Sequence, residues 1–372
     1  GEKMKFSINK SSLQSSLISL NKVIPVRSTL PILSSVLFDI QKDHIELIAT
    51  DLEITLSVIL PTETAETGKI AIPLKTILDI TQEIPEGDLF FEITDIGKII
   101  ISTDFGKYTI MGKQPDEFPS KPSVDKPNEV IIKARDLADV IDNTNYAVSK
   151  DEMKPQLLGV LLQMKNEQIT AVATDGHRLV QYTKMGMKGH TFEGEAILPS
   201  KFLSIIRGQL VNQDDVNLKI SENHVQVTID GSTIYSRIIK QRFPDYESVI
   251  PIDNDKKMTI NRDEFLQSIK RVSIFSNKST KQISLSIGDN QLIVSTEDPE
   301  NITTGREKIN CEYDGDPLAI GYNALYLREV LMHQKEDVVK MRLKSPVSAG
   351  IFKYEGKKEK MTTLIMPIRI ND

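Results

Sequence analysis

The chain has 372 residues, of which 39% are hydrophobic and 26% charged, and it contains no tryptophan. This length predicts two or three domains, and the composition is typical of a soluble globular protein rather than a disordered chain. The formal net charge of −6 argues against a protein that coats nucleic acid through bulk positive charge, while a local basic surface stays open.

The same counts argue against metal, cofactor and membrane classes. One cysteine, Cys311, cannot form an internal disulfide, and five scattered histidines offer no metal-ligand spacing, so we expect neither a metal nor another cofactor. No apolar run approaches the ~18–20 residues of a membrane span, and the first residues lack the apolar core of a signal peptide. Cytoplasm is therefore the expected location.

An internal repeat organises the chain. Three segments with the alternation of a half-buried strand run directly into a helix: Lys5–Asn9, 129–133 and 257–261. The apolar helix positions recur at i, i+4 and i+7: Leu13, Leu17 and Leu20; Leu137, Ile141 and Thr144; Phe265, Ile269 and Val272. Ser11, Asp136 and Asp263 are the candidate helix N-caps.

Further strands follow each of these helices. Two are joined by a three-residue polar turn, and a third follows, so the predicted repeat is β-α-β-β-β; the turns are Gln41–Asp43, Lys165–Glu167 and Gly288–Asn290. A second copy begins at each of 69–73, 195–199 and 317–322, with helices around 77–80, 202–210 and 325–331. Any α+β protein shows loosely similar patterns, but the matching turn lengths and helix registers favour a true repeat.

Six such repeats predict an α+β fold of three tandem domains, each with two helices packed against antiparallel sheets. Proline-rich joints place the domains at residues 1–122, 129–251 and 255–372. Three similar domains joined by short linkers bend into an arc, and two arcs that meet through a symmetric interface close a ring. Helices would line the inside of this ring, with the sheets outside.

Basic residues recur on the helices and the adjoining loops: Lys22, Arg27, Lys75, Arg135, Lys201, Arg207, Lys270, Arg271, Arg328 and Lys335. Any one of them is equally well explained as solvated surface, but their recurrence in corresponding repeats favours a shared role. Contacts of this kind reach phosphates without reading bases. Binding would then be salt-sensitive, independent of sequence and compatible with sliding.

Several separated motifs carry a resemblance to a known family. They are Met4–Phe6, Thr29–Leu33, Thr50–Glu53, Ala173–Leu179, Phe243–Tyr246 and Met366–Arg369. In this order they resemble the bacterial sliding clamp, the beta subunit of DNA polymerase III, over essentially the whole chain from Met4. The resemblance implies three DNA-clamp domains in a non-catalytic, homodimeric ring that encircles double-stranded DNA and confers processivity on the replicative polymerase.

The partners that the resemblance implies are an ATP-driven clamp loader, the DNA polymerase III catalytic subunit, other polymerases and repair proteins. Short linear peptides of these partners enter a hydrophobic groove between the second and third domains. Matched residue by residue, its lining is Leu157, Thr174, Gly176, His177, Arg178, Leu179, Pro244, Val249, Val347, Met366 and Pro367. An adaptable methionine beside a few polar anchors suits such capture. Taken singly and without the resemblance, Leu179, Val249 and Met366 are more typical of a core.

For DNA contact the resemblance implies Arg27, Lys75, Lys150, Gln156 and Lys201. The loop that carries Lys150 has Asp151, Pro155 and Gln156 where the best-known members offer glutamine and aromatic side chains, which puts base stacking by this loop in doubt. The dimer contact would bring Tyr108 and Ile110 of one subunit against Ile274 and Phe275 of the other.

Two alternatives stay open. An enzyme centred on His177, with Asp175 and Arg178 beside it, lacks a nucleophile motif, paired carboxylates and a phosphate loop, and Asp-Gly-His is equally typical of a tight turn. Gly186–Gly189 is interpreted as an ordinary loop. The second alternative is a repeat scaffold that uses its groove for proteins without binding DNA.

Overall fold

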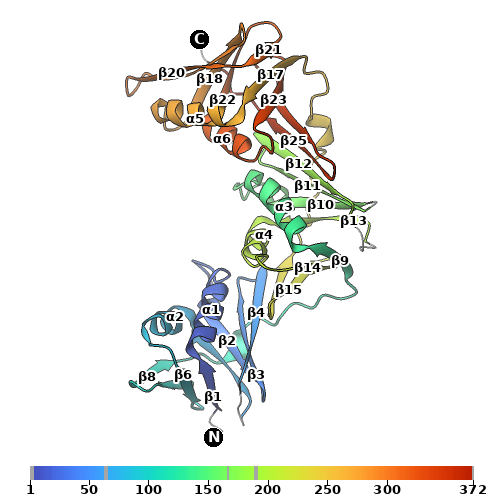
Figure 1. Ribbon diagram of the computed structural model, residues 1–372. Helices are drawn as coiled ribbons and strands as arrows, with labels where there is room; N and C mark the ends of the chain where they lie inside the picture. Colours follow the sequence, from blue (N-terminus) through green and yellow to red (C-terminus); the bar gives the residue numbers. More distant parts are fainter. Residues whose placement is uncertain (1–3, 63–65, 166, 188–191, 371–372) are drawn as a thin grey trace. The chain divides into compact units, whose positions relative to one another are not determined.

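The computed structural model describes residues 4–62, 66–165, 167–187 and 192–370 (Figure 1). The first two repeats comprise β1 (Met4–Asn9), α1 (Lys10–Asn21), β2 (Ser35–Ile40), β3 (His44–Thr50), β4 (Ile54–Pro61), β5 (Gly68–Pro73), α2 (Leu74–Glu83), β6 (Asp88–Ile93), β7 (Lys98–Ser102) and β8 (Lys107–Met111). The next two comprise β9 (Asn128–Lys133), α3 (Ala134–Thr144), β10 (Gly159–Lys165), β11 (Gln168–Thr174), β12 (Arg178–Met185), β13 (Gly194–Pro199), α4 (Ser200–Arg207), β14 (Asp215–Ile220), β15 (His224–Ile229) and β16 (Ser232–Arg237).

The last two repeats comprise β17 (Lys256–Asn261), α5 (Arg262–Val272), β18 (Gln282–Gly288), β19 (Gln291–Asp298), β20 (Thr303–Asn310), β22 (Leu318–Asn323), α6 (Ala324–Met332), β23 (Val338–Leu343), β24 (Gly350–Glu355) and β25 (Glu359–Ile365), with a short extra strand β21 (Glu312–Asp314) between them. The predicted β-α-β-β-β order is thus confirmed in all six places. Helix α4 ends at Arg207, short of the predicted Leu210.

Contacts divide the chain into two compact units: unit 1 holds residues 1–134 and 205–238, and unit 2 holds 135–204 and 239–372. The division crosses the predicted central domain because its sheets join those of both neighbours in sequence: β16 pairs with β4 in unit 1, and β12 pairs with β25 in unit 2. The three predicted domains follow the repeats rather than these contacts, and their boundaries stay a proposal.

Unit 1 contains two antiparallel sheets, in the orders β5-β2-β3-β4-β16-β15-β14-β9 and β1-β6-β7-β8. Leu13, Leu17 and Leu20 of α1 are fully buried, as their spacing predicts. The rings of Phe6 and Phe91 stack with centroids 4.6 Å apart, so the paired strands β1 and β6 also meet through their inward side chains.

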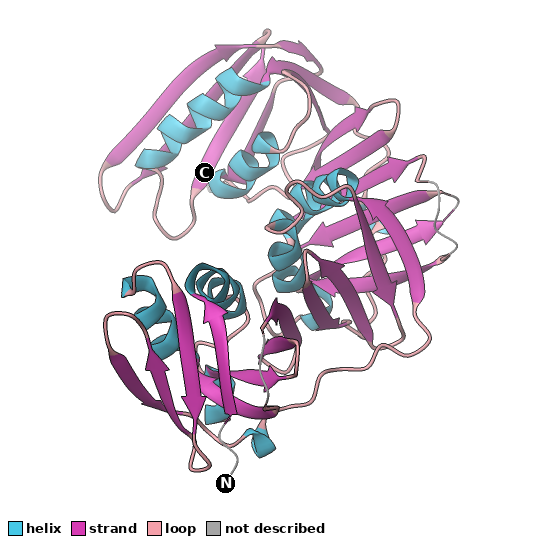
Figure 2. Cartoon of the chain, turned by 60° about the horizontal axis from the view of Figure 1, so that its bottom comes forward, coloured by secondary structure: helices cyan, strands magenta, loops and turns pink. Residues whose placement is uncertain are grey.

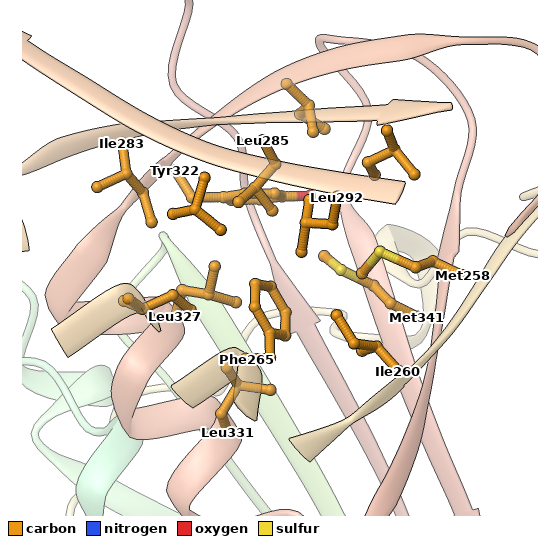
Figure 3. Close-up of a cluster of buried hydrophobic side chains, with 14 of the residues drawn as sticks. Met258, Ile260, Phe265, Ile283, Leu285, Leu292, Tyr322, Leu327, Leu331 and Met341 are labelled. Carbon is orange, nitrogen blue, oxygen red and sulfur yellow. The ribbon is translucent and has the colours of Figure 1, made fainter. Parts of the chain in front are cut away.

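Unit 2 contains the sheets β13-β10-β11-β12-β25-β24-β23-β17-β21 and β20-β19-β18-β22. Within each unit the helices cover one face of the sheets, in the layered arrangement that amphipathic helices require (Figure 2). Figure 3 shows the core under α5 and α6, where Phe265 and Leu327 point toward Leu285 and other side chains of the strands. Phe265 and Ile269 of α5 are fully buried, again as predicted.

The predicted helix caps are wrong in α1 and α5. Asn9 and Asn261 are the caps, and each accepts a hydrogen bond from a backbone amide three residues on, at 3.2 and 2.9 Å. Ser11 and Asp263 lie inside their helices, and the Ser11 hydroxyl donates to Glu86 instead. The error arises because each strand runs straight into its helix, so that the last strand residue is also the cap. Asp136 likewise lies within the first turn of α3.

Two predicted connections reach beyond the described part of the chain. The turn at Lys165–Glu167 contains Asn166, and the loop at Gly186–Gly189 contains Lys188 and Gly189, and these three residues lie outside the described residues. Among the helices in the described ranges, none is long and apolar enough to span a membrane.

Candidate functional site

A pocket of about 310 Å³ opens in unit 2, beside the turn between β11 and β12. The residues expected from the sequence that line it are Leu157, Thr174, Gly176, Arg178, Leu179, Pro244, Val249 and Met366. Asp245, Tyr246 and Leu364 complete the lining. Four segments therefore build the pocket: the short turn before β10, the β11–β12 turn, the segment before β17, and the end of β25.

The turn at Thr174–Arg178 is held by its own side chains. The Thr174 hydroxyl donates to the carbonyl of Arg178 at 2.7 Å and accepts from the amide of Gly176 at 3.1 Å. The Asp175 carboxylate accepts from the amides of His177 and Arg178, at 2.9 and 3.0 Å. Gly176 has a φ of +89°, a conformation that glycine adopts without strain. The rim of the pocket is thus fixed without help from a ligand.

Beneath the rim lies an apolar floor. Leu157, Leu179 and Leu364 belong to a buried cluster that also includes Leu161, Val172, Ile197, Phe243, Tyr246 and Ala349. Val249 stays 56% exposed and Met366 42% exposed at the mouth. A cavity with buried aliphatic walls and exposed apolar side chains at its mouth suits an apolar group of a ligand.

Arg178 supplies the one guanidinium of the lining, and its side chain is only 7% exposed. Its Nη1 pairs with Glu329, its Nη2 donates to the carbonyl of Tyr146 at 2.8 Å, and its Nε lies 3.3 Å from an Asp175 oxygen. The guanidinium carbon also lies 4.7 Å from the ring centroid of Tyr326. The positive charge is therefore compensated within unit 2, and Arg178 forms a rigid wall rather than a free anion-binding group.

Tyr246 forms another wall of the pocket. Its hydroxyl donates to the side-chain oxygen of Gln163 at 2.8 Å, which ties the segment before β17 to strand β10. Burial raises the pKa of the Tyr246 hydroxyl, and the neighbouring Glu247 carboxylate adds to this shift. The hydroxyl therefore stays protonated and can keep donating at neutral pH.

Three expected residues do not line the pocket. His177 projects from the turn and stacks on the ring of Tyr326 with centroids 5.6 Å apart, Val347 is 62% exposed, and Pro367 follows Met366. Of the residues that the sequence analysis missed, Asp245 and Tyr246 fall inside a motif that carried the family resemblance. Leu364 stands in the continuous apolar run Leu364–Met366, so no alternation of the last strand singles it out.

The geometry around His177 favours the turn interpretation over an enzyme centre. The Asp175 carboxylate binds backbone amides and approaches Arg178, rather than orienting the imidazole. Among the described residues, no group of three His, Cys, Asp or Glu side chains is arranged to hold a metal ion.

The basic residues expected at DNA fall in both units. Arg27 is exposed in the loop after α1, and Lys75 is exposed as the second residue of α2, both in unit 1. In unit 2, Lys150 is exposed in the loop after α3, Gln156 is half-buried in a short 3-10 turn, and Lys201 is exposed as the second residue of α4. Lys75 and Lys201 thus occupy the same position of corresponding helices.

Two of the residues expected at a dimer contact lie on an outermost strand, and the other two lie in the turn after α5, beside another outermost strand. Tyr108 and Ile110 are half-buried on β8, the outermost strand of its sheet in unit 1. Ile274 is 76% and Phe275 42% exposed after α5 in unit 2. The carbonyl of Phe275 accepts a hydrogen bond from Thr303 of β20, again an outermost strand, at 3.0 Å.

Comparison with known proteins covers nearly the whole chain. Family models match the N-terminal, central and C-terminal domains of the DNA polymerase III beta subunit at residues 4–122, 131–245 and 247–369. The beta sliding clamp of Pseudomonas aeruginosa is 28% identical, with 99% of this chain and all of that protein covered.

Solved structures of sliding clamps are also similar to this chain over nearly its whole length. The sliding clamp of Pseudomonas aeruginosa bound to griselimycin is 27% identical, with a TM-score of 0.89. The sliding clamp of Bartonella birtlesii bound to griselimycin is 26% identical, with a TM-score of 0.92. In both cases 99% of this chain and all of the other chain are covered.

Proposed function

We propose, since this chain belongs to the DNA polymerase III beta subunit family, that it is a sliding clamp that encircles duplex DNA as a homodimeric ring and confers processivity on the replicative polymerase. The observation that carries the proposal is the sixfold β-α-β-β-β repeat, which the three family domains match in the same order over residues 4–122, 131–245 and 247–369. Its role is to tether, and we assign it no catalytic step.

Sequence-independent contact with DNA is the first element of the proposal. Arg27, Lys75, Lys150 and Lys201 are exposed at or near helix ends, where long cationic side chains can reach phosphates. Such contacts are individually weak and salt-sensitive, and they allow movement along the duplex. A closed ring supplies the retention that weak contacts lack. Gln156, half-buried beside Lys150, would contribute less.

A homodimer is the second element. Strands β8 and β20 are outermost in their sheets, and each has apolar side chains nearby: Tyr108 and Ile110 at β8, Ile274 and Phe275 at β20. If the β8 pair of one subunit contacts the Ile274–Phe275 pair of its partner, each subunit uses both of its surfaces, one in each of two identical contacts. Two such contacts close a ring of two chains.

The pocket of unit 2 is the third element, as the place where the polymerase catalytic subunit, the clamp loader and repair proteins insert short linear peptides. Its apolar floor and the adaptable Met366 suit capture of apolar side chains from several partners. We expect griselimycin, the ligand of two related clamps, to bind in the same place. Deletion of residues 366–372 should weaken binding of peptides and of griselimycin while leaving the dimer intact.

The ring is tested first by light scattering across a dilution series. A mass near twice the 41.8 kDa chain is expected, and Ile274→Arg should lower it toward that of one chain because a charge would enter the apolar contact. The control Ile252→Arg, at a site 97% exposed in the segment before β17, should leave the mass unchanged. A wild-type protein that is monomeric at every concentration would rule out the two-chain ring.

Encirclement is tested by retention on circular DNA. The clamp should stay on a closed circle, loaded by its clamp loader, and leave when the circle is cut, because a ring slides off free ends. Retention that does not depend on DNA ends would contradict the topological mechanism. Absence of retention beside intact peptide binding would instead favour a protein scaffold that does not use DNA.

A further inference from the structure

The segment that follows β25 is fastened at two points in unit 2. The amide of Met366 donates to the carbonyl of His177, and the amide of Ile368 donates to the carbonyl of Gly321 in β22, both at 2.8 Å. Pro367 lies between them and restricts its own φ to about −65°. We call residues 366–370 the C-terminal tail. Its two bonds hold Met366, whose side chain lines the pocket, against the β11–β12 turn.

Gly321 is the position at which the tail comes closest to the sheet. A Cβ atom added there would lie 2.7 Å from the carbonyl oxygen of Ile368 and 3.0 Å from Cγ1 of Ile370. The first of these atoms belongs to the backbone, so it cannot rotate aside as a flexible side chain would. Any side chain at position 321 therefore has to displace the tail or the strand.

The other repeats show that the bridge alone does not require glycine. Ala71 of β5 forms the corresponding bridge with Lys113, and Ile197 of β13 forms it with Ile239. In the last repeat the tail passes so close that the Ile370 side chain also lies over position 321. The close approach of the tail, and not the backbone bridge itself, therefore requires glycine at position 321.

We propose that Gly321 is a positioning residue of the pocket: by letting the tail lie against β22, it keeps Met366 at the pocket mouth. Gly321 does not line the pocket and acts only through the tail. The inference rests on the proposed function of this pocket as a ligand groove. It adds a determinant of affinity that lies on a different strand from every lining residue.

The test substitutes Gly321→Ala and measures griselimycin affinity by calorimetry, with amide hydrogen exchange at Ile368 as a second readout. Because the tail loses its second anchor, we expect affinity to fall about three- to tenfold, a range set by partial loss of one contact side chain. Exchange at Ile368 should become faster. Gly288→Ala is the matched control, since its added Cβ would meet Pro317 at an ordinary 3.6 Å in the same sheet.

Two further variants separate the tail from other causes. Ile368→Pro removes the amide donor without changing β22, and it should weaken griselimycin to a similar extent. In a chain that ends at Pro367, Gly321→Ala should cause no additional loss, because the segment that it displaces is gone. The same loss in the shortened chain would show that the substitution acts through the strand, and this would overturn the inference.

The experiments give different results if the proposed ligand groove is wrong and if the positioning role of Gly321 is wrong. If the wild-type protein does not bind griselimycin, the proposed groove is wrong, while faster exchange at Ile368 in Gly321→Ala would still show that the glycine fastens the tail. If the wild type binds and Gly321→Ala changes neither affinity nor exchange, Gly321 has no positioning role. Should Gly321→Ala fail to fold, Ile368→Pro decides the question by griselimycin affinity and by faster amide exchange at Met366, whose amide forms the other bond of the tail.

Discussion

Gly176 and Leu52 occupy the same position of the same turn in two different repeats. Gly176 has a φ of +89° and Leu52 a φ of +78°, and the amide of each donates to a threonine hydroxyl two residues earlier at 3.1 Å. One turn lines the pocket of unit 2, whereas the other carries a leucine that is 44% exposed. The chain thus shows that this backbone accepts a leucine side chain.

From this relationship we predict that Gly176→Leu folds and obstructs the pocket. A Cβ at position 176 would meet no atom within 4 Å, so the cost should be limited to the left-handed backbone, roughly 1–2 kcal/mol. A leucine at the rim should weaken griselimycin binding by at least about tenfold, or 1.4 kcal/mol. Calorimetry measures the affinity and a thermal scan measures the fold.

Gly231→Leu is the matched control for this prediction. Gly231 has a φ of +75° and equally open surroundings, but it does not line the pocket. Its backbone cost should therefore be similar, with ligand affinity unchanged. If Gly176→Leu binds griselimycin as tightly as Gly231→Leu does, the ligand does not use this rim.

Arg178→Lys should destabilise the protein although it keeps the charge. One ammonium group cannot replace the contacts that the guanidinium makes with Glu329, the Tyr146 carbonyl and Asp175. Loss of part of a buried, paired network costs about 2–4 kcal/mol, so the melting temperature should fall by several degrees. Arg27→Lys, at an exposed position, should change it little. An equal effect of both substitutions would mean that the Arg178 contacts contribute no stability.

Much of the fold could be predicted because it depends on short-range periodicity. The spacing of Leu13, Leu17 and Leu20 marks one buried helix face, and its recurrence at Phe265, Ile269 and Val272 reveals the repeat. Several site residues could be identified only through motifs of the family. Residues such as Leu179 and Met366 have no feature, taken one at a time, that distinguishes a pocket wall from a core position.

The rest depends on contacts that no local pattern encodes. The bond between Ile368 and Gly321 joins residues 47 positions apart, and neither side chain forms it. The environment of Arg178 likewise comes from Tyr146, 32 positions earlier in the chain, and from Glu329 of the last repeat. The caps were missed for a local reason instead, because Asn9 and Asn261 serve both a strand and a helix.

Tyr322→Phe should reduce the loss of stability in alkaline solution. Tyr322 is fully buried, and its hydroxyl has no hydrogen-bond partner among the described residues. Burial raises the pKa of this hydroxyl far above its ordinary value of 10.0. The unfolded chain therefore releases the proton above about pH 10 while the folded protein keeps it, so the stability from this group is full below pH 10 and declines above it.

The measurement is the melting temperature from pH 7 to 11 for the wild type and Tyr322→Phe. The variant should match or exceed the wild type at pH 7, since an unpaired buried hydroxyl is removed, and its advantage should grow above pH 10 by up to about 1.4 kcal/mol per pH unit. Tyr354→Phe, at a half-buried position, is the comparison. Parallel curves for the wild type and Tyr322→Phe would contradict the prediction.

Lys75→Ala and Lys201→Ala should weaken DNA binding and make the affinity less dependent on salt concentration. Both lysines are the second residue of their helices, one in each compact unit, and a phosphate contact by either would release condensed counterions. The slope of log affinity against log salt should become shallower by about 0.9 for each lysine removed, for every DNA sequence alike. Lys353→Ala, exposed on strand β24, should leave the slope unchanged. A weakening that depends on the DNA sequence, or a slope equal to that of the wild type, would exclude these two lysines as phosphate contacts.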